Sequence, residues 1–165
     1  MSRKMILVML TAFVANLFSM NAYAHNHAKT VNSKADGSMA ASALISDTWA
    51  RATFALAKTG AAYFIISNSG DKAILIKSIS ISPKFAMSAE LHHTVMKNDM
   101  MQMRELDDGV RIEPEETVEF SPGAKHIMIM GLRGPLIKGK ELALTIHFED
   151  GSRAEHLFSI LDKRD

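Results

Sequence analysis

The sequence predicts an all-β domain, and three features of the chain lead to that prediction. Apolar and polar residues alternate over short segments, as expected for strands with one buried face. Turn-forming residues separate these segments, at "NSGD" (68–71), "DDG" (107–109), "SPGAK" (121–125) and "EDGS" (149–152). The spacing between turns is too short for most helices, and the chain has the length of a single ordinary domain.

The first 24 residues are predicted to be a signal peptide. Arg3 and Lys4 precede an apolar run over residues 5–20, and "AYA" (22–24) has the small-x-small pattern of a cleavage site. The run is shorter than the ~20 residues that a spanning helix needs. We therefore expect export to the periplasm and no stable membrane insertion after cleavage, with a retained N-terminal anchor as the alternative.

The rest of the chain is predicted to consist of a flexible tail at 25–43, a folded domain at 44–161 and a short C-terminal tail at 162–165. The segment 25–43 is rich in Ala, Ser, Asn and Lys and has no apolar period. It offers little surface whose burial would offset the entropy cost of ordering.

Within the domain, ten strands are expected, and the pair around "EDG" (149–151) forms the clearest hairpin. The alanines of "WARATFALAK" (49–58) also suit a short helix, so this segment is open between the two. The expected strands are 45–53, 61–68, 73–81, 85–95, 100–106, 110–112, 117–120, 126–130, 142–149 and 153–160.

Charge and composition exclude several functions. Removing the leader with Arg3 and Lys4 changes the formal net charge from +1 to −1, so no basic face for nucleic acid is expected. The chain contains no cysteine, which excludes disulfides, thiolate metal ligands and a blue-copper electron-transfer centre. Soft-metal chemistry would have to use methionine and histidine.

Two segments carry such donors. In "KHIMIMG" (125–131), strand alternation places His126, Met128 and Met130 on one face and the isoleucines on the other. In "ELHHTVMKNDMMQMR" (90–104), His92 shares a face with Glu90 and Thr94. The "KND" turn lets Met101 and Met103 fold back towards His92.

Imidazole and uncharged thioether donors together favour Cu(I) over Zn²⁺, Mg²⁺ or Ca²⁺. The alternative is that each methionine only fills the core and each histidine only faces solvent. The concentration of donors argues against it, because seven methionines lie between Met87 and Met130 and the expected mature chain has one other, Met39. Met87, Met96 and Met100 are predicted to be packing or rim residues rather than ligands.

These residues also resemble a known family. The pattern H-x10-M, from His92 to Met103, followed by H-x-M at His126 and Met128, is similar to the signature of PCuAC-type periplasmic copper chaperones. "WARAT", "GAAYFIISNSGD", "AELH", "FSPGAKHIMIMGL" and "LTIHFEDG" extend the resemblance over residues 47–158.

The resemblance implies a cupredoxin-like Greek-key β-sandwich or barrel that binds one Cu(I) through His92, Met103, His126 and Met128. It further implies transfer of copper to the dinuclear copper centre of cytochrome c oxidase subunit II, with a thioredoxin-like protein as a possible assembly partner. A copper-buffering or resistance protein is the alternative.

An enzyme is not expected, because no nucleophile elbow, phosphate-binding loop or HExxH motif occurs. Two rivals stay open: a copper-dependent redox enzyme that uses His25 as an N-terminal ligand, and a metal-free adhesin or assembly module. Cleavage after Ala24 would also place His27 third in the mature chain. A free amine followed by a histidine at that position suits square-planar Cu(II), which predicts a second copper site.

Overall fold

The structure is a computed structural model that describes residues 38–97 and 99–163. The predicted signal peptide, His25 and His27 lie outside the described residues, as does most of the predicted flexible tail. Over the described ranges, no helix has the length and apolar character needed to cross a bilayer.

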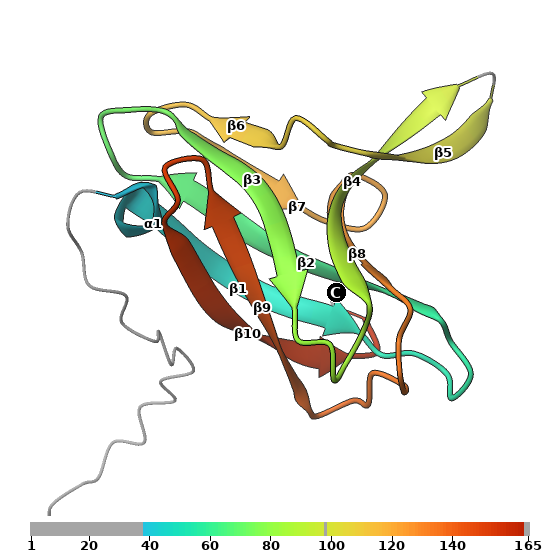
Figure 1. The fold of residues 1–165 in the computed structure, drawn as a ribbon. Coiled ribbons are helices and arrows are strands. Elements are labelled where there is room, and N and C mark those ends of the chain that lie inside the picture. Colours follow the sequence, from blue (N-terminus) through green and yellow to red (C-terminus); the bar gives the residue numbers. More distant parts are fainter. Residues whose placement is uncertain (1–37, 98, 164–165) are drawn as a thin grey trace, which may run out of the picture.

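The predicted all-β architecture is confirmed, and the described part of the chain has ten strands after one short helix (Figure 1). The segment that could have been helical, 49–58, continues a strand and then becomes a loop. The elements are α1 (Met39–Ser42), β1 (Ala43–Arg51), β2 (Thr59–Asn68), β3 (Ile74–Ile81), β4 (Ser88–Lys97), β5 (Met100–Glu105), β6 (Val110–Ile112), β7 (Thr117–Phe120), β8 (Lys125–Met130), β9 (Glu141–Phe148) and β10 (Arg153–Leu161).

The packed part of the chain begins before residue 44. Ser38 caps α1, whose first backbone N–H, at Met39, donates to the Asp150 carboxylate at 2.7 Å. The next N–H, at Ala40, donates to the Ser152 hydroxyl at 3.1 Å. These bonds fasten the helix to the β9–β10 turn, so residues 38–43 belong to the domain rather than to the tail.

The strands follow one another around a single core in the order β5-β4-β8-β2-β1-β10-β9-β3-β6. A further pairing of β3 with β4, through Ile79 and Ala89, closes the ring of strands. All pairings are antiparallel except that of β1 with β10. The β4–β5 hairpin projects from the upper end of the sandwich in Figure 1.

Aromatic and branched aliphatic side chains fill the interior. Phe64 of β2 stacks on Phe120 of β7 with ring centroids 4.2 Å apart and meets Phe158 of β10 edge-on at 6.2 Å. Ile127 and Ile129 of β8 are completely buried, as their alternation with His126 predicts. The turn residues also act as expected: a Cβ at Gly109, where φ is +83°, would lie 2.2 Å from the Ile76 carbonyl oxygen.

One strand begins later than predicted. Residues 82–87 form a loop, because the Phe85 and Ala86 N–H groups both donate to the Ser82 carbonyl instead of a neighbouring strand. The strand β4 therefore starts at Ser88 rather than at Phe85.

Candidate metal centre

The strands β5, β4 and β8 lie side by side and bring the predicted ligands to one face. His92 is paired directly with His126 of β8 and, on its other side, with Glu105 of β5. Residues opposite one another in an antiparallel ladder project to the same face. This pairing joins the β4–β5 hairpin to β8, which follows about twenty residues later in the sequence.

The two predicted methionines are diagonal neighbours of His92. Met103 is paired with Thr94, two residues along β4 in one direction, and Met128 is paired with Glu90, two residues along in the other. Diagonal neighbours have Cα atoms ~7–8 Å apart, within reach of long side chains. The thioethers thus flank the histidine pair from opposite directions along β4.

His126 presents an unprotonated nitrogen that has no partner. Its Nδ1 lies 3.0 Å from the Ala124 carbonyl oxygen, which only accepts hydrogen bonds, so Nδ1 carries the proton. Its Nε2 is buried and lacks a hydrogen-bond partner among the residues that the structure describes, and the residue is only 4% exposed. Such an orphaned acceptor is uncommon in a folded protein, where buried polar atoms are nearly always bonded.

His92 repeats this arrangement with the opposite nitrogen. Its Nε2 donates to a carboxylate oxygen of Glu90 at 3.2 Å, which leaves the lone pair on Nδ1. This Nδ1 is also buried and has no partner within residues 38–97 and 99–163. The two imidazole rings are 5.9 Å apart between centroids, so the two free lone pairs belong to neighbouring rings.

Glu90 holds the His92 ring in this tautomer. The Ser88 hydroxyl donates to Glu90 at 2.8 Å, and this bond, followed by the one from His92, keeps the pKa of the Glu90 carboxyl below its ordinary value. Metal-binding histidines commonly donate their other N–H to a carboxylate in this way, which orients the ring and makes it a stronger ligand. The arrangement thus matches a metal site whose metal would lie on the Nδ1 side.

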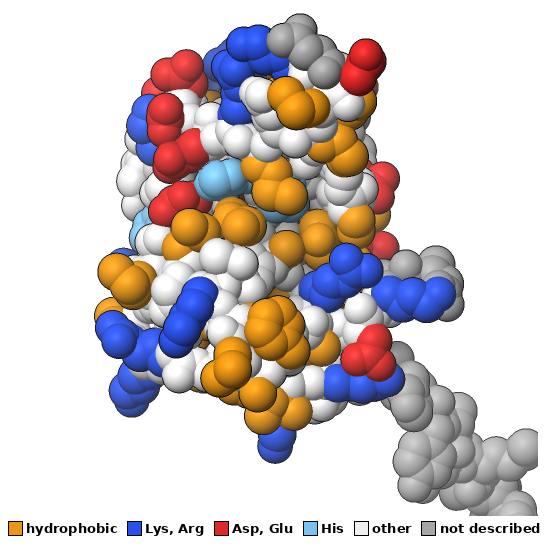
Figure 2. Space-filling model, turned by 90° about the vertical axis from the view of Figure 1, so that its right-hand side faces the viewer, with side chains coloured by type: hydrophobic (Ala, Val, Ile, Leu, Met, Phe, Trp, Pro, Cys, Tyr) orange, Lys and Arg blue, Asp and Glu red, His pale blue; other side chains and the backbone are white. Residues whose placement is uncertain are grey.

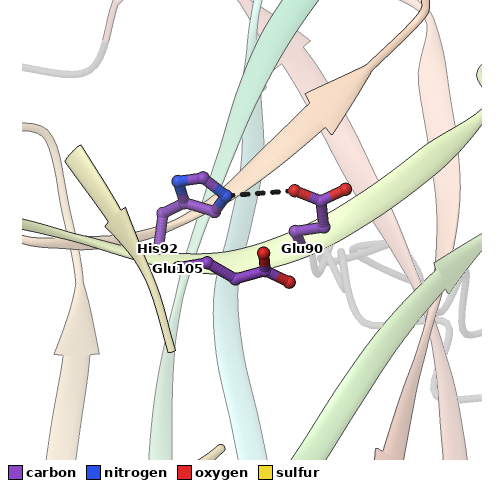
Figure 3. A group of neighbouring side chains, drawn as sticks. All are labelled: Glu90, His92 and Glu105. Carbon is purple, nitrogen blue, oxygen red and sulfur yellow. Dashed lines mark hydrogen bonds and ion pairs between the residues drawn. The ribbon is translucent and has the colours of Figure 1, made fainter. Parts of the chain in front are cut away.

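A carboxylate pair lies beside His92 as well. Glu90, His92 and Glu105 offer ligand atoms within 4.8 Å of one another, and Figure 3 shows Glu90 and Glu105 on the same side of the ring. Neither glutamate was predicted from the sequence to have a role. The sequence could have indicated Glu90 as a site residue, because it shares a strand face with His92. Glu105 can be identified as a site residue only once the register of β5 against β4 is known.

The methionines differ in how far their side chains are exposed to solvent. Met128 is half-buried, whereas Met103 is 61% exposed on the edge strand β5. Met87, Met96 and Met100, predicted to be packing or rim residues, are 75%, 66% and 59% exposed. They therefore lie at the surface rather than in the core.

The sequence of the domain is similar to a known protein family and to individual relatives. Residues 44–160 match the family described as putative lipoprotein LpqE-like. A putative lipoprotein of Leifsonia xyli subsp. xyli is 34% identical over 125 residues, which is 76% of this chain and 70% of that protein. An uncharacterized protein of Rickettsia prowazekii is 30% identical over 108 residues, 64% of this chain and 59% of that protein.

Solved structures share the fold. The apo PCuAC domain from PmoF1 matches with a TM-score of 0.60 at 20% identity, over 74% of this chain and 95% of that domain. The copper-bound PCuAC domain from PmoF2 matches with a TM-score of 0.60 at 16% identity, over 74% and 94%. Cu(I)-bound DR1885 from Deinococcus radiodurans matches with a TM-score of 0.56 at 21% identity, over 73% and 80%.

Proposed function

The chain belongs to the LpqE-like family of putative lipoproteins and has a PCuAC-type fold, and on that premise we propose that it is a copper chaperone rather than an enzyme. The proposed cargo is Cu(I), held by His92, Met103, His126 and Met128. Structures of the same fold carry copper according to their descriptions, which supports the assignment.

One observation carries the proposal: two buried imidazole lone pairs, on His92 Nδ1 and His126 Nε2, have no partner and lie on paired residues. A bound ion would satisfy both. The neighbouring donors on that face are thioethers, which select a soft monovalent ion. All four donors are neutral, so binding requires no deprotonation once both histidines are neutral.

The proposed mechanism is ligand exchange. His126 and Met128 lie on β8, between two neighbouring strands, and would keep hold of the ion while Met103, on the exposed edge strand, is displaced first. An acceptor that offers thiolates would then take over the ion stepwise, because thiolates bind Cu(I) more strongly than neutral thioethers do.

Anaerobic competition between the protein and a chromophoric Cu(I) chelator tests the site. The wild type should bind one equivalent tightly, and His126→Ala and Met103→Ala should weaken that binding. Two matched controls lie on the opposite face of the same hairpin: His93→Ala, next to His92, and Met100→Leu, whose side chain is 59% exposed against 61% for Met103. Equal loss in the controls would refute the proposed ligand set.

We further propose delivery to the dinuclear copper centre of cytochrome c oxidase subunit II, with a thioredoxin-like protein as assembly partner. Mixing an excess of the Cu(I)-loaded protein with the soluble copper-binding domain of subunit II, followed by one-electron oxidation with ferricyanide, should generate the absorption of the mixed-valence dinuclear centre. If copper stays on the chaperone while the acceptor domain remains able to take up free copper, the buffering alternative is correct.

For the N-terminus we propose export to the periplasm, cleavage after Ala24 and Cu(II) binding at the new terminus. The lipoprotein-like relatives support export. Mass spectrometry of the exported protein tests the cleavage site. Replacing His27 by Ala should then remove any tail-bound Cu(II) signal in electron paramagnetic resonance, and an unchanged spectrum would exclude that site.

A further inference from the structure

Three loops at one end of the sandwich are joined into a platform, which we define as residues 52–58, 82–87 and 131–140 (lower end of Figure 1). The first and third loops exchange hydrogen bonds between Thr53 and Leu136, at 3.0 and 2.9 Å. The second and third are joined through the Arg133 N–H and the Phe85 carbonyl, at 2.9 Å. These bonds fix the three loops against one another.

Large apolar side chains project from every loop of the platform. Phe54 and Leu56, in the first loop, are 75% and 81% exposed. Phe85 and Met87, in the second, are 46% and 75% exposed, and Ile137, in the third, is 56% exposed. Figure 2 shows hydrophobic side chains gathered on the lower part of this face, beneath the histidines. Grouped exposure of this kind marks an interaction surface.

The platform is also strongly basic. The three loops contain five lysine or arginine residues and no aspartate or glutamate, although the whole chain has 19 basic and 18 acidic residues. Blue Lys and Arg side chains surround the hydrophobic ones in the lower part of Figure 2. The five residues are Lys58, Lys84, Arg133, Lys138 and Lys140. Lys138 forms an ion pair with Asp162 of the C-terminal segment, so the remaining four cations carry the charge of the platform.

We propose that the platform docks the protein on an anionic phospholipid surface. Apolar loop residues would enter the boundary between headgroups and acyl chains while the surrounding cations face lipid phosphates. Lysine and arginine suit this position because their apolar stems can lie against the bilayer while the charged ends reach the headgroups. Phe54 and Leu56 project from the first loop and Ile137 from the third, and the three loops contain no carboxylate, which favours a negatively charged lipid surface over a protein of mixed charge.

The platform adjoins the proposed metal centre. The Met87 N–H donates to the Met130 carbonyl at 2.9 Å, at the end of β8, two residues beyond Met128. A docked protein would therefore hold its copper site close to the lipid surface, where a membrane-embedded acceptor would be reached. The docking itself does not depend on copper.

Cosedimentation of the full mature chain with vesicles tests the proposal. Binding is expected to vesicles that contain phosphatidylglycerol, and little to vesicles of phosphatidylcholine alone, with loss at high salt. The variant Phe54→Ser/Leu56→Ser and the variant Lys58→Glu/Lys84→Glu should each weaken binding by ~10-fold or more. Cu(I) stoichiometry should stay at the wild-type value in both, which separates this test from that of the copper site.

The matched controls lie at the opposite end of the sandwich. Leu44, at the start of β1, is 58% exposed, and Lys72 is an exposed cation in the β2–β3 turn. Leu44→Ser and Lys72→Glu should bind vesicles like the wild type. The proposal is overturned by absent binding to anionic vesicles at low salt, by equal binding to neutral vesicles, by equal losses in the controls, or by association only with an acidic protein.

Discussion

The two halves of the proposed metal centre differ in how firmly the fold holds them. His126 and Met128 lie on β8, which is paired on both sides and whose other face inserts Ile127 and Ile129 into the core. Met103 lies on β5, an edge strand on which most residues are exposed. At the proposed copper site, this difference predicts a fixed half that would retain copper and an accessible half that would exchange it.

The largest expected difference concerns stability. Ile127→Ala should lower the free energy of unfolding by about 3 kcal/mol, because it removes a fully buried side chain and leaves a cavity. Met103→Ala should change it by less than about 0.5 kcal/mol, because the side chain is mostly exposed. Urea denaturation of the copper-free protein measures both. Similar losses would mean that β5 is as firmly held as β8.

The second prediction tests the fixed half directly. His126→Leu should weaken Cu(I) binding by more than about 100-fold, beyond the usual effect of losing a residue that only orients a ligand. The copper-free protein should be as stable as the wild type or slightly more stable, since a buried nitrogen without a partner is removed. In this variant the Ala124 carbonyl loses the bond from His126 but keeps the hydrogen bond that the Thr94 N–H donates. Chelator competition and thermal melting measure the two effects, and a destabilised apoprotein would assign His126 a structural role.

The third prediction separates the two thioethers. Met128→Leu should lower equilibrium affinity by about 10-fold, whereas Met103→Leu should lower it less and should have its larger effect on the rate of copper release to a thiolate acceptor. Stopped-flow transfer to an acceptor, together with competition titration, distinguishes affinity from rate. Identical profiles for the two variants would remove the distinction between a retaining half and an exchanging half.

The smallest expected effect concerns the residue that orients His92. Glu90→Gln keeps the shape of the side chain but replaces the carboxylate, so the His92 ring should be held less firmly in the tautomer with a free Nδ1. Affinity for Cu(I) should fall by up to about 10-fold. The ring-nitrogen chemical shifts of His92 should report a change in tautomer in the copper-free protein, which a purely structural role would leave unaltered. Unchanged shifts would exclude the orienting role.

Much of the fold was predictable because its signals are local. The alternation around Ile127 and Ile129 identified the buried face of β8, and Gly109 identified a turn whose backbone has a positive φ. The start of β4 was predicted wrongly at Phe85, because local hydrogen bonds to Ser82 compete with strand pairing there. The segment 38–43 was assigned to the tail, since its anchors, Asp150 and Ser152, lie more than 100 residues away.

By itself, the sequence determined the all-β class, the family and the donors gathered in two segments, since residue type, alternation and turn chemistry act over a few neighbouring residues. Only the tertiary structure decided that His92 lies opposite His126, which nitrogen of each ring is free, and that Glu90 and Glu105 stand beside them. The same holds for the platform, whose three loops are separated in the chain. Strand register and loop association depend on long-range pairing around a common core, and no local pattern specifies them.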